Sequence, residues 1–301
     1  MGYGGALIWT GLARNLKKAY PNKKVLFIYK KGIRDFLSGK TNKDFVIYEN
    51  NPDIDMILSK DRYFFQKSKF NQNNWIIVDM NNPRLHYWEK DDKKRVIYKC
   101  GKHAIEWACE YFKIKNILLK PVLKLTDKEL KKVNELLVTH HLKTKDFIVI
   151  EPNAKQSFAP NNRWFWDRWQ ELADLLDKRG QVMVQLGPEG SPLLHGVVNL
   201  IGKTSFREAV GLVGKSKLFV GYSGGLMHGA RAMDVNAVIL ASGFEPLEVA
   251  NYPQNLNIYK KTDCAPCGLK TPCPYGRKCM RDITVEEVYN NIYDRRNKIT
   301  I

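Results

Sequence analysis

The sequence Leu218-Phe-Val-Gly-Tyr-Ser-Gly-Gly-Leu-Met-His228 joins a short apolar strand to a helix through a glycine-rich loop. The apolar residues Leu218 to Val220 predict the strand, and a helix is expected from about Leu226 to Met233. Backbone amides at the N-terminus of a helix attract anions, and glycines let a ligand approach them closely. The stretch therefore predicts a phosphate-binding loop at the carboxyl end of a parallel strand.

The same order of strand, loop and helix recurs around this stretch. Apolar runs predict further strands at 147–150, 182–186 and 237–240, and helical periodicity predicts helices at 166–178 and 205–213. This alternation is typical of a domain built on a parallel sheet with helices on its faces.

The first part of the chain has a similar pattern. Helices are expected at 12–20 and 103–112, and strands at 25–29, 45–48, 75–79 and 96–98. Between the two parts, residues 120–141 form an expected connector, in which Thr126-Asp-Lys-Glu129 has the pattern of a capping box at a helix start. The predicted class is α/β, with two Rossmann-like doubly wound parallel-sheet domains, at 1–125 and 126–301, that face a cleft.

The glycine-rich start is unusual for such a domain. Gly2-Tyr-Gly-Gly5 follows Met1 directly, although a loop of this kind normally follows a strand. We therefore expect the N-terminal domain to lack its first strand in this sequence. A parallel sheet without a central strand would leave backbone groups unpaired, so we expect the native start to lie upstream of Met1.

The chain is strongly basic. Its 301 residues contain 49 Lys and Arg against 31 Asp and Glu, a net charge of +18. Residues 1–125 hold 25 of the basic and 12 of the acidic residues, so most of the excess lies in the first domain. Two interpretations remain open, a solvated lysine-rich surface or a face for an anionic ligand. No familiar nucleic-acid-binding motif is present, so nucleic acid is the least expected partner.

Hydropathy indicates the expected compartment, and the spacing of four cysteines predicts a metal site. No apolar run reaches the ~18 residues of a membrane-spanning helix, and the N-terminus has no signal-peptide pattern, so the expected compartment is the cytoplasm. Cys264, Cys267, Cys273 and Cys279 lie within one segment, 264–279. Four thiolates at such spacing can surround one tetrahedral ion, and we expect a structural zinc or iron ion there.

Several short motifs occur in a characteristic order. They are Gly4-Gly-Ala-Leu-Ile-Trp-Thr10, Glu151-Pro-Asn-Ala-Lys155, Asn161-Asn-Arg-Trp164, Gly187-Pro-Glu189, Thr204-Ser-Phe-Arg-Glu-Ala209, Ser223-Gly-Gly-Leu-Met-His228-Gly-Ala230 and Gly243-Phe-Glu-Pro246. Together with the cysteine segment, this order resembles glycosyltransferase family 9, the heptosyltransferase-like enzymes of the GT-B fold. The resemblance covers most of residues 145–290 and the first thirty residues.

The resemblance implies an enzyme that moves a sugar, heptose or a related one, from a nucleotide-sugar to lipopolysaccharide or another bacterial surface glycan, with inversion. It implies an anionic glycan or glycolipid acceptor on the first domain, peripheral contact with the inner membrane, no organic cofactor, and no metal at the diphosphate. The implied donor-binding residues are Asn153, Lys155, Arg163, Glu189, Ser223, Gly224, Gly225 and His228. Within this set, Lys155 and Arg163 are expected to neutralise the leaving diphosphate, and Glu189 to hold the ribose.

Two positions depart from the family pattern. The opening loop Gly4-Gly5 has Gly5 where the family usually has an Asp that activates the acceptor hydroxyl, and Ser223 stands where most members have Asp or Glu. Loss of a general base costs about 10²–10⁴-fold in rate. Either another carboxylate serves, with Glu151 and Glu245 as candidates, or the protein is a catalytically impaired homologue that binds nucleotide or glycan.

Overall fold

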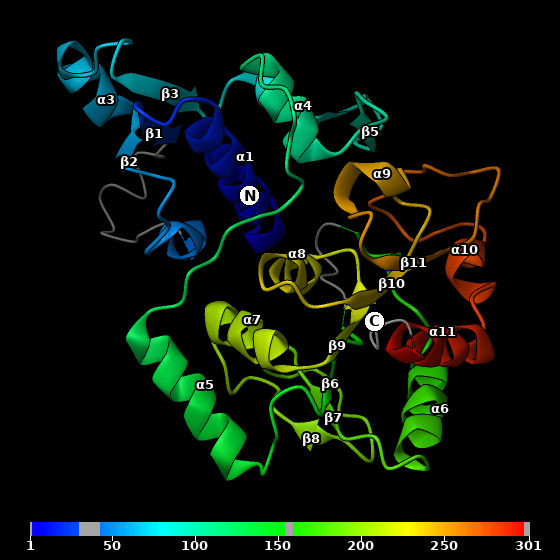
Figure 1. The fold of residues 1–301 in the computed structure, drawn as a ribbon. Coiled ribbons are helices and arrows are strands. Elements are labelled where there is room, and N and C mark those ends of the chain that lie inside the picture. The colour runs from blue at the N-terminus through cyan, green and yellow to red at the C-terminus, as the bar shows by residue number, and fades with distance from the viewer. Residues whose placement is uncertain (1, 30–42, 154–158, 298–301) are drawn as a thin grey trace. The chain divides into compact units, whose positions relative to one another are not determined.

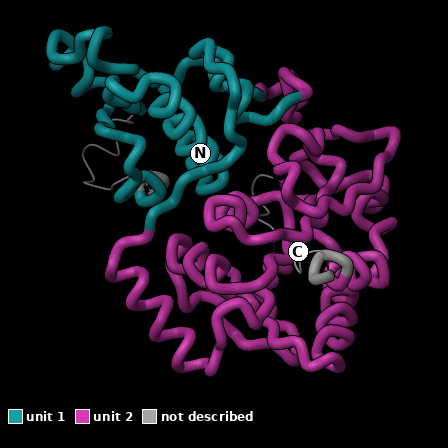
Figure 2. Tube along the Cα trace, viewed as in Figure 1, with its two compact units in different colours: residues 1–87, 102–124 teal, residues 88–101, 125–301 magenta. Residues whose placement is uncertain are grey.

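The computed structural model describes residues 2–29, 43–153 and 159–297, which form two compact units. Unit 1 contains residues 1–87 and 102–124, and unit 2 contains residues 88–101 and 125–301 (Figure 2). A short segment from the first part of the sequence, residues 88–101, is thus packed within unit 2.

Unit 1 is built on a three-stranded parallel sheet with the order β2-β1-β3 (Figure 1). Its strands are β1 (Lys24–Tyr29), β2 (Met56–Ser59) and β3 (Trp75–Asp79). The central strand β1 is the most apolar, and Leu26 pairs with Met56 on one side and with Ile77 on the other. Such a fully buried apolar run is what a central parallel strand requires.

Helices cover this sheet. They are α1 (Tyr3–Ala19), α3 (Lys60–Gln66) and α4 (Ala104–Tyr111), with short 3₁₀ turns η1 (Lys43–Tyr48), η2 (Lys67–Lys69) and η3 (Pro83–Leu85). In α1, Gly11 lies so close to Ile105 of α4 that a Cβ at this position would come within 2.5 Å of its side chain. A glycine in the middle of α1 thus lets the two helices pack closely.

The strand predicted at 45–48 is wrong. These residues form η1 instead, and Ile47 and Tyr48 are buried. The Tyr48 ring contacts the Phe27 ring edge to face at 5.8 Å. Ile47 and Tyr48 are therefore buried without pairing in the sheet, and Tyr48 packs on an aromatic side chain of β1.

The strand predicted at 96–98 exists but has a different partner from the expected one. It is β5 (Val96–Tyr98), which pairs antiparallel with β4 (Trp88–Lys90) to form a hairpin. Val96 donates a backbone hydrogen bond to the Gly268 carbonyl at 3.0 Å and packs with Phe244. These long-range contacts explain why the hairpin belongs to unit 2.

Unit 2 contains a six-stranded parallel sheet with the order β11-β10-β9-β6-β7-β8. The strands are β6 (Ile148–Ile150), β7 (Met183–Gln185), β8 (Val198–Asn199), β9 (Leu218–Tyr222), β10 (Ala237–Ala241) and β11 (Leu256–Tyr259). The paired central strands β6 and β9 lie in register, with Ile148 opposite Leu218 and Ile150 opposite Val220. The carboxyl ends of the strands therefore lie along one edge of the sheet.

The helices of unit 2 form two layers, with α6 and α11 on one side of the sheet and α7 and α8 on the other (Figure 1). They are α5 (Asp127–Thr139), α6 (Trp166–Asp177), α7 (Phe206–Lys215), α8 (Gly225–Ala232), α9 (Leu247–Ala250), α10 (Lys278–Arg281) and α11 (Val285–Asn297). The predicted capping box is confirmed: Glu129 N donates to Thr126 Oγ1, and Thr126 N donates to Glu129 Oε2.

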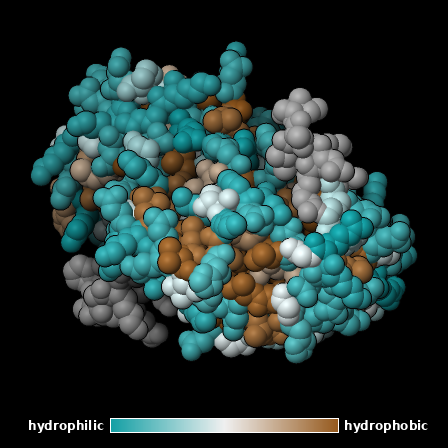
Figure 3. Space-filling model, turned by 60° about the horizontal axis from the view of Figure 1, so that its bottom comes forward, coloured by the Kyte–Doolittle hydropathy of each residue, from teal (hydrophilic) through white to brown (hydrophobic). Residues whose placement is uncertain are grey.

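The surface is largely hydrophilic. On the face shown in Figure 3, apolar side chains gather around the centre among hydrophilic ones. Among the helices of the described ranges, none is both long enough and apolar enough to cross a bilayer.

Candidate functional site

The loop between β9 and α8 forms the centre of the candidate site. The N-cap residue Gly224 is extended, and no side chain of the described residues caps the helix that follows. The first backbone N–H groups of a helix have no intrahelical acceptor, and their partial positive charge attracts anions. The predicted residues Ser223, Gly224 and Gly225 thus lie together at a helix N-terminus suited to a phosphate group.

A carboxyl group lies beside this helix start. The Ser223 hydroxyl donates a hydrogen bond of 2.5 Å to Glu245 Oε1, and the Tyr98 hydroxyl donates one of 3.3 Å to Glu245 Oε2. Removal from water raises the pKa of Glu245, and these two hydrogen bonds to the carboxylate oppose the rise. Position 223 lacks the carboxylate of the family, but a carboxylate from the loop after β10 lies within hydrogen-bonding distance of it.

Tyr222 fixes the end of β9. Its hydroxyl accepts hydrogen bonds from Trp164 N at 2.8 Å and Trp169 Nε1 at 2.6 Å, and donates to the Pro152 carbonyl at 3.3 Å. Burial raises the pKa of Tyr222, so its hydroxyl remains a neutral donor and acceptor. One side chain therefore ties β9 to the segments after β6 and before α6.

The segment before α6 lies directly beside Ser223. Asn162 is buried, and its Nδ2 donates to the Ser223 carbonyl at 3.4 Å. Its Oδ1 is also buried and has no hydrogen-bond partner within the described part of the chain. Arg163 Nε donates to the Pro160 carbonyl at 3.3 Å, and the Arg163 carbonyl accepts from Arg277 at 2.8 Å. The structure thus places Arg163 in this loop, one residue after Asn162.

Two predicted residues follow β6. Burial raises the pKa of the Glu151 carboxyl to about 8, so it is mainly protonated at neutral pH. The Asn153 Nδ2 is buried without a hydrogen-bond partner in the described residues and lies close to Gly187. Lys155 lies outside the described residues. Glu151 and Asn153 are thus at the same sheet edge as Ser223.

Glu189 and His228 have different surroundings. Glu189 is exposed in the turn after β7 and lies against Gly202. His228 is only 4% exposed, its Nδ1 lies 2.6 Å from the Tyr252 hydroxyl, and the two rings pack edge to face. The ribose and phosphate roles of these two residues remain predictions, and His228 also has a structural role inside unit 2.

The opening glycines lie in a helix. Gly4 and Gly5 are in the first turn of α1, which begins at Tyr3 and has no acidic residue in that turn. The sequence predicted a loop here and a helix that begins near Leu12. Neither glycine supplies a functional group, so the general base must come from another residue.

The four clustered cysteines lie close together in the structure. Cys264, Cys267, Cys273 and Cys279 all line one cavity of about 20 Å³. However, no group of three or more His, Cys, Asp or Glu in the described residues is arranged to hold a metal ion. The structure therefore does not support the predicted zinc or iron site.

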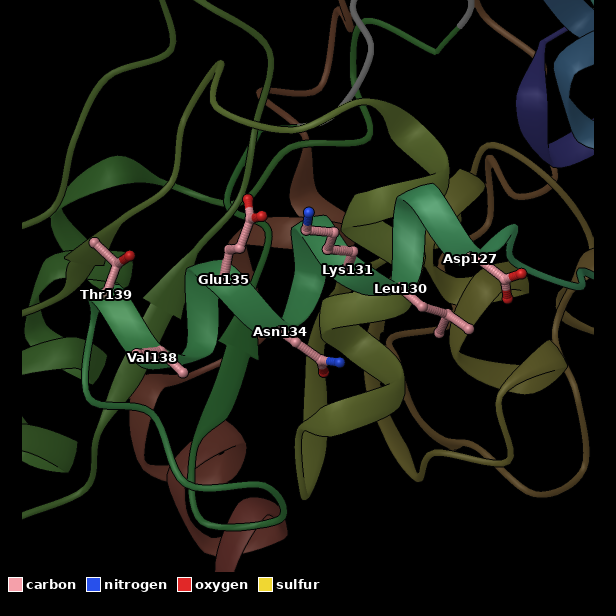
Figure 4. A pocket seen from close by; sticks show the side chains of 7 residues that line it. All are labelled: Asp127, Leu130, Lys131, Asn134, Glu135, Val138 and Thr139. Atoms are coloured by element: carbon pink, nitrogen blue, oxygen red, sulfur yellow. The ribbon is translucent and has the colours of Figure 1, made fainter.

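A larger depression lies elsewhere. It has a volume of about 600 Å³ and is lined only by residues of α5. In Figure 4 the Lys131 and Glu135 side chains project to one side of the helix, and Leu130 and Asn134 to the other. Since these side chains do not converge, the depression does not have the form of a binding site.

Sequence reasoning missed three side chains of the site. Tyr98 and Tyr252 lie 147 and 24 residues from their partners, Glu245 and His228. Tyr222 is part of an apolar run, so its hydroxyl network had no signal of its own. The glycine pattern indicated where the site is, but these contacts depend on the folded chain.

The fold resembles those of solved glycosyltransferases. A family 9 glycosyltransferase from Veillonella parvula has a TM-score of 0.68 at 15% identity, with 98% of this chain and 94% of that one covered. The Escherichia coli ADP-heptose lipopolysaccharide heptosyltransferase II has a TM-score of 0.65 at 16% identity, with 99% and 97% covered. The iron-containing dodecameric glycosyltransferase TibC of E. coli has a TM-score of 0.60 at 14% identity, with 93% and 77% covered.

The family follows from the sequence match. No curated protein matches the chain significantly. The model of glycosyltransferase family 9 (heptosyltransferase) matches residues 86–277, which is more than half of the chain. Those residues include the β9–α8 loop, Glu245 and three of the four clustered cysteines, Cys264, Cys267 and Cys273. The chain therefore belongs to glycosyltransferase family 9 and is a glycosyltransferase of the GT-B fold class.

Proposed function

We propose that this glycosyltransferase moves a sugar, heptose or a related one, from a nucleotide-sugar to lipopolysaccharide or another bacterial surface glycan, with inversion at the anomeric carbon. The uncapped N-terminus of α8, beside the Ser223–Glu245 hydrogen bond, is the observation that carries the proposal. TibC has also been solved with ADP-D-β-D-heptose, and the E. coli heptosyltransferase WaaC with ADP. These two complexes support a nucleotide diphosphate as the anion.

In the proposed donor complex, the first amides of α8 bind the diphosphate. The diphosphate gains negative charge as the glycosidic bond breaks, so these amides stabilise the leaving group in the transition state. Arg163, in the loop beside Ser223, adds positive charge there. The buried Asn162 Oδ1 accepts no hydrogen bond from the described residues. In the proposed complex it accepts one from a hydroxyl group of the donor.

Glu245 is the carboxylate that we assign to proton transfer. The acceptor hydroxyl attacks the anomeric carbon, the bond to the diphosphate breaks, and the hydroxyl proton passes to the Glu245 carboxylate. Ser223 and Tyr98 hold that carboxylate by its two oxygens. We prefer Glu245 to Glu151 because only Glu245 is bonded to the residue next to the helix start.

Unit 1 is the proposed acceptor-binding part. It carries 20 basic and 9 acidic residues, a net charge of +11, which suits a phosphorylated glycan or glycolipid. Such an acceptor is a membrane component, so we place the protein at the inner face of the cytoplasmic membrane, as a peripheral protein.

Isothermal titration with ADP-, GDP- and UDP-sugars tests the donor, and mass spectrometry of glycan products tests transfer. We expect one nucleotide class to bind and its sugar to appear on an acceptor. Failure of all three classes to bind contradicts the proposal. Binding without transfer, together with transfer gained in Gly5→Asp, identifies the impaired homologue instead.

A further inference from the structure

Two adjacent phenylalanines on α3 are almost fully exposed. The Phe64 side chain is 76% exposed and the Phe65 side chain is 85% exposed, and their rings contact each other edge to face at 6.3 Å. Single exposed apolar residues are common, but two neighbouring aromatic rings at this exposure form an apolar tip that water solvates poorly. In the described part of unit 1, neither ring belongs to the core cluster around Leu26, Ile28 and Phe70.

The neighbouring aromatic residue shows that α3 itself is anchored. Tyr63 stacks on Phe70 at 5.8 Å, and Phe70 contacts Trp75 of β3 edge to face at 5.2 Å. The Ser59 hydroxyl accepts from Arg62 N at 3.4 Å and caps the helix. Tyr63 thus packs toward the sheet, whereas Phe64 and Phe65 are exposed on α3, which lies next to β2 (Figure 1).

Basic residues flank the two phenylalanines in the sequence. Residues 60–69 contain Lys60, Arg62, Lys67 and Lys69 against a single carboxylate, Asp61. Lys60 lies 3.8 Å from Asp79, whereas Arg62, Lys67 and Lys69 have no ion-pair partner among the described residues. We call residues 60–69 the α3 tip; it combines two exposed aromatic rings with a net charge of +3.

We infer that the α3 tip docks on an anionic lipid surface. Aromatic rings enter the boundary between headgroups and acyl chains, and nearby Lys and Arg side chains are attracted to anionic headgroups. A second copy of this chain fits less well, because two tips of net charge +3 would repel each other. The inference rests on the proposed function in one respect: a membrane glycolipid acceptor gives the protein a reason to reach that surface.

Sedimentation of the full-length protein with vesicles tests the inference. The vesicles contain phosphatidylcholine alone or phosphatidylcholine with phosphatidylglycerol. We expect binding to the anionic vesicles only, weakened by added salt because charge contributes to it. The double variant Phe64→Ser/Phe65→Ser is expected to lose at least about tenfold in partition coefficient, and Lys67→Glu/Lys69→Glu a similar amount.

The control is Val138→Ser, since Val138 of α5 is also 76% exposed. It is expected to bind vesicles like the wild type, and all variants are expected to keep the wild-type melting temperature and nucleotide-sugar affinity. Those two readouts separate loss of the membrane surface from failure of the proposed donor site. Unchanged vesicle binding by both double variants, or no binding by the wild type, overturns the inference. A dimer in gel filtration that the Phe variants dissociate overturns it in favour of a self-association surface.

Discussion

The two units of the protein place their unusual side chains in opposite environments. Unit 2 buries charged and polar groups: Arg207 is fully buried in an ion pair with Glu129, and Glu245 is bonded inside the β9–α8 site. Unit 1 exposes apolar ones, Phe64 and Phe65. Buried polar groups are costly unless they are paired, and exposed aromatic rings are unfavourable in water. This difference is consistent with the proposed chemistry in unit 2 and the proposed membrane surface in unit 1.

The largest effect is expected for Glu245→Gln, which tests whether the carboxylate in unit 2 takes part in proton transfer. If the half-buried Glu245 carboxylate accepts the proton of the acceptor hydroxyl, kcat is expected to fall by about 10²–10⁴-fold, with a smaller change in the donor KM. The measurement is the steady-state rate of sugar transfer, with the donor and acceptor identified by the titration and mass-spectrometry experiments described above. Glu248→Gln on the exposed surface of α9 is the control. Near-wild-type kcat in Glu245→Gln would return the assignment to Glu151 or another group.

The buried ion pair gives the second test. Arg207 Nε lies 2.6 Å from Glu129 Oε1, and Arg207 Nη2 lies 3.0 Å from Glu129 Oε2. Glu129→Gln keeps a capping-box side chain but deprives the buried guanidinium of its counter-charge, so we expect a loss of about 3–5 kcal/mol in the free energy of unfolding. Urea denaturation measures it. Glu208→Gln is the matched control, because Glu208 has the same capping role in α7. Equal effects of the two variants would refute a special role for the buried pair.

The third test concerns the hydroxyl that fixes β9. Tyr222→Phe leaves the N–H groups of Trp164 and Trp169 without their acceptor, so the free energy of unfolding is expected to fall by about 2–3 kcal/mol. Thermal unfolding followed by circular dichroism measures the change. Tyr111→Phe on unit 1 also removes one hydroxyl, but from an exposed residue, and is expected to change stability little. An equally small change in Tyr222→Phe would show that the network does not hold the site.

The last test concerns the pH dependence that Glu151 gives to the free energy of unfolding. Its pKa is about 8 in the fold against 4.5 as the ordinary value, so between these values the folded state keeps a proton that the unfolded state has lost. Stability therefore falls as pH rises through this window. Glu151→Gln removes the dependence and is expected to stabilise the protein at pH ~8, with little effect at pH ~5. A constant difference across that range, or a matching response in the exposed Glu171→Gln, contradicts the assignment.

Much of unit 2 could be predicted because its elements depend on local patterns. The apolar runs of β6, β7, β9 and β10 and the Thr126–Glu129 capping box are short-range signals. The apolar run at 45–48 predicted a strand wrongly, because its end, Tyr48, is buried by an aromatic contact with Phe27 without sheet pairing. The Tyr98–Glu245 hydrogen bond could not be predicted, since a hairpin from the first part of the sequence joins a loop 147 residues later. For the same reason, the sequence named both Glu151 and Glu245 as candidate carboxylates but could not choose between them.

The measurement that tests the central claim most directly is titration of the nucleotide-sugar into Gly224→Asp. Gly224 is extended with φ −171°, and a Cβ there meets nothing closer than 3.9 Å, so the fold accommodates Asp. The new carboxylate would cap the α8 amides and repel the diphosphate. We predict that Gly224→Asp has an unchanged or higher melting temperature and a dissociation constant for the nucleotide-sugar at least about tenfold higher than that of the wild type. Wild-type affinity in a folded Gly224→Asp protein would contradict diphosphate binding at the start of α8.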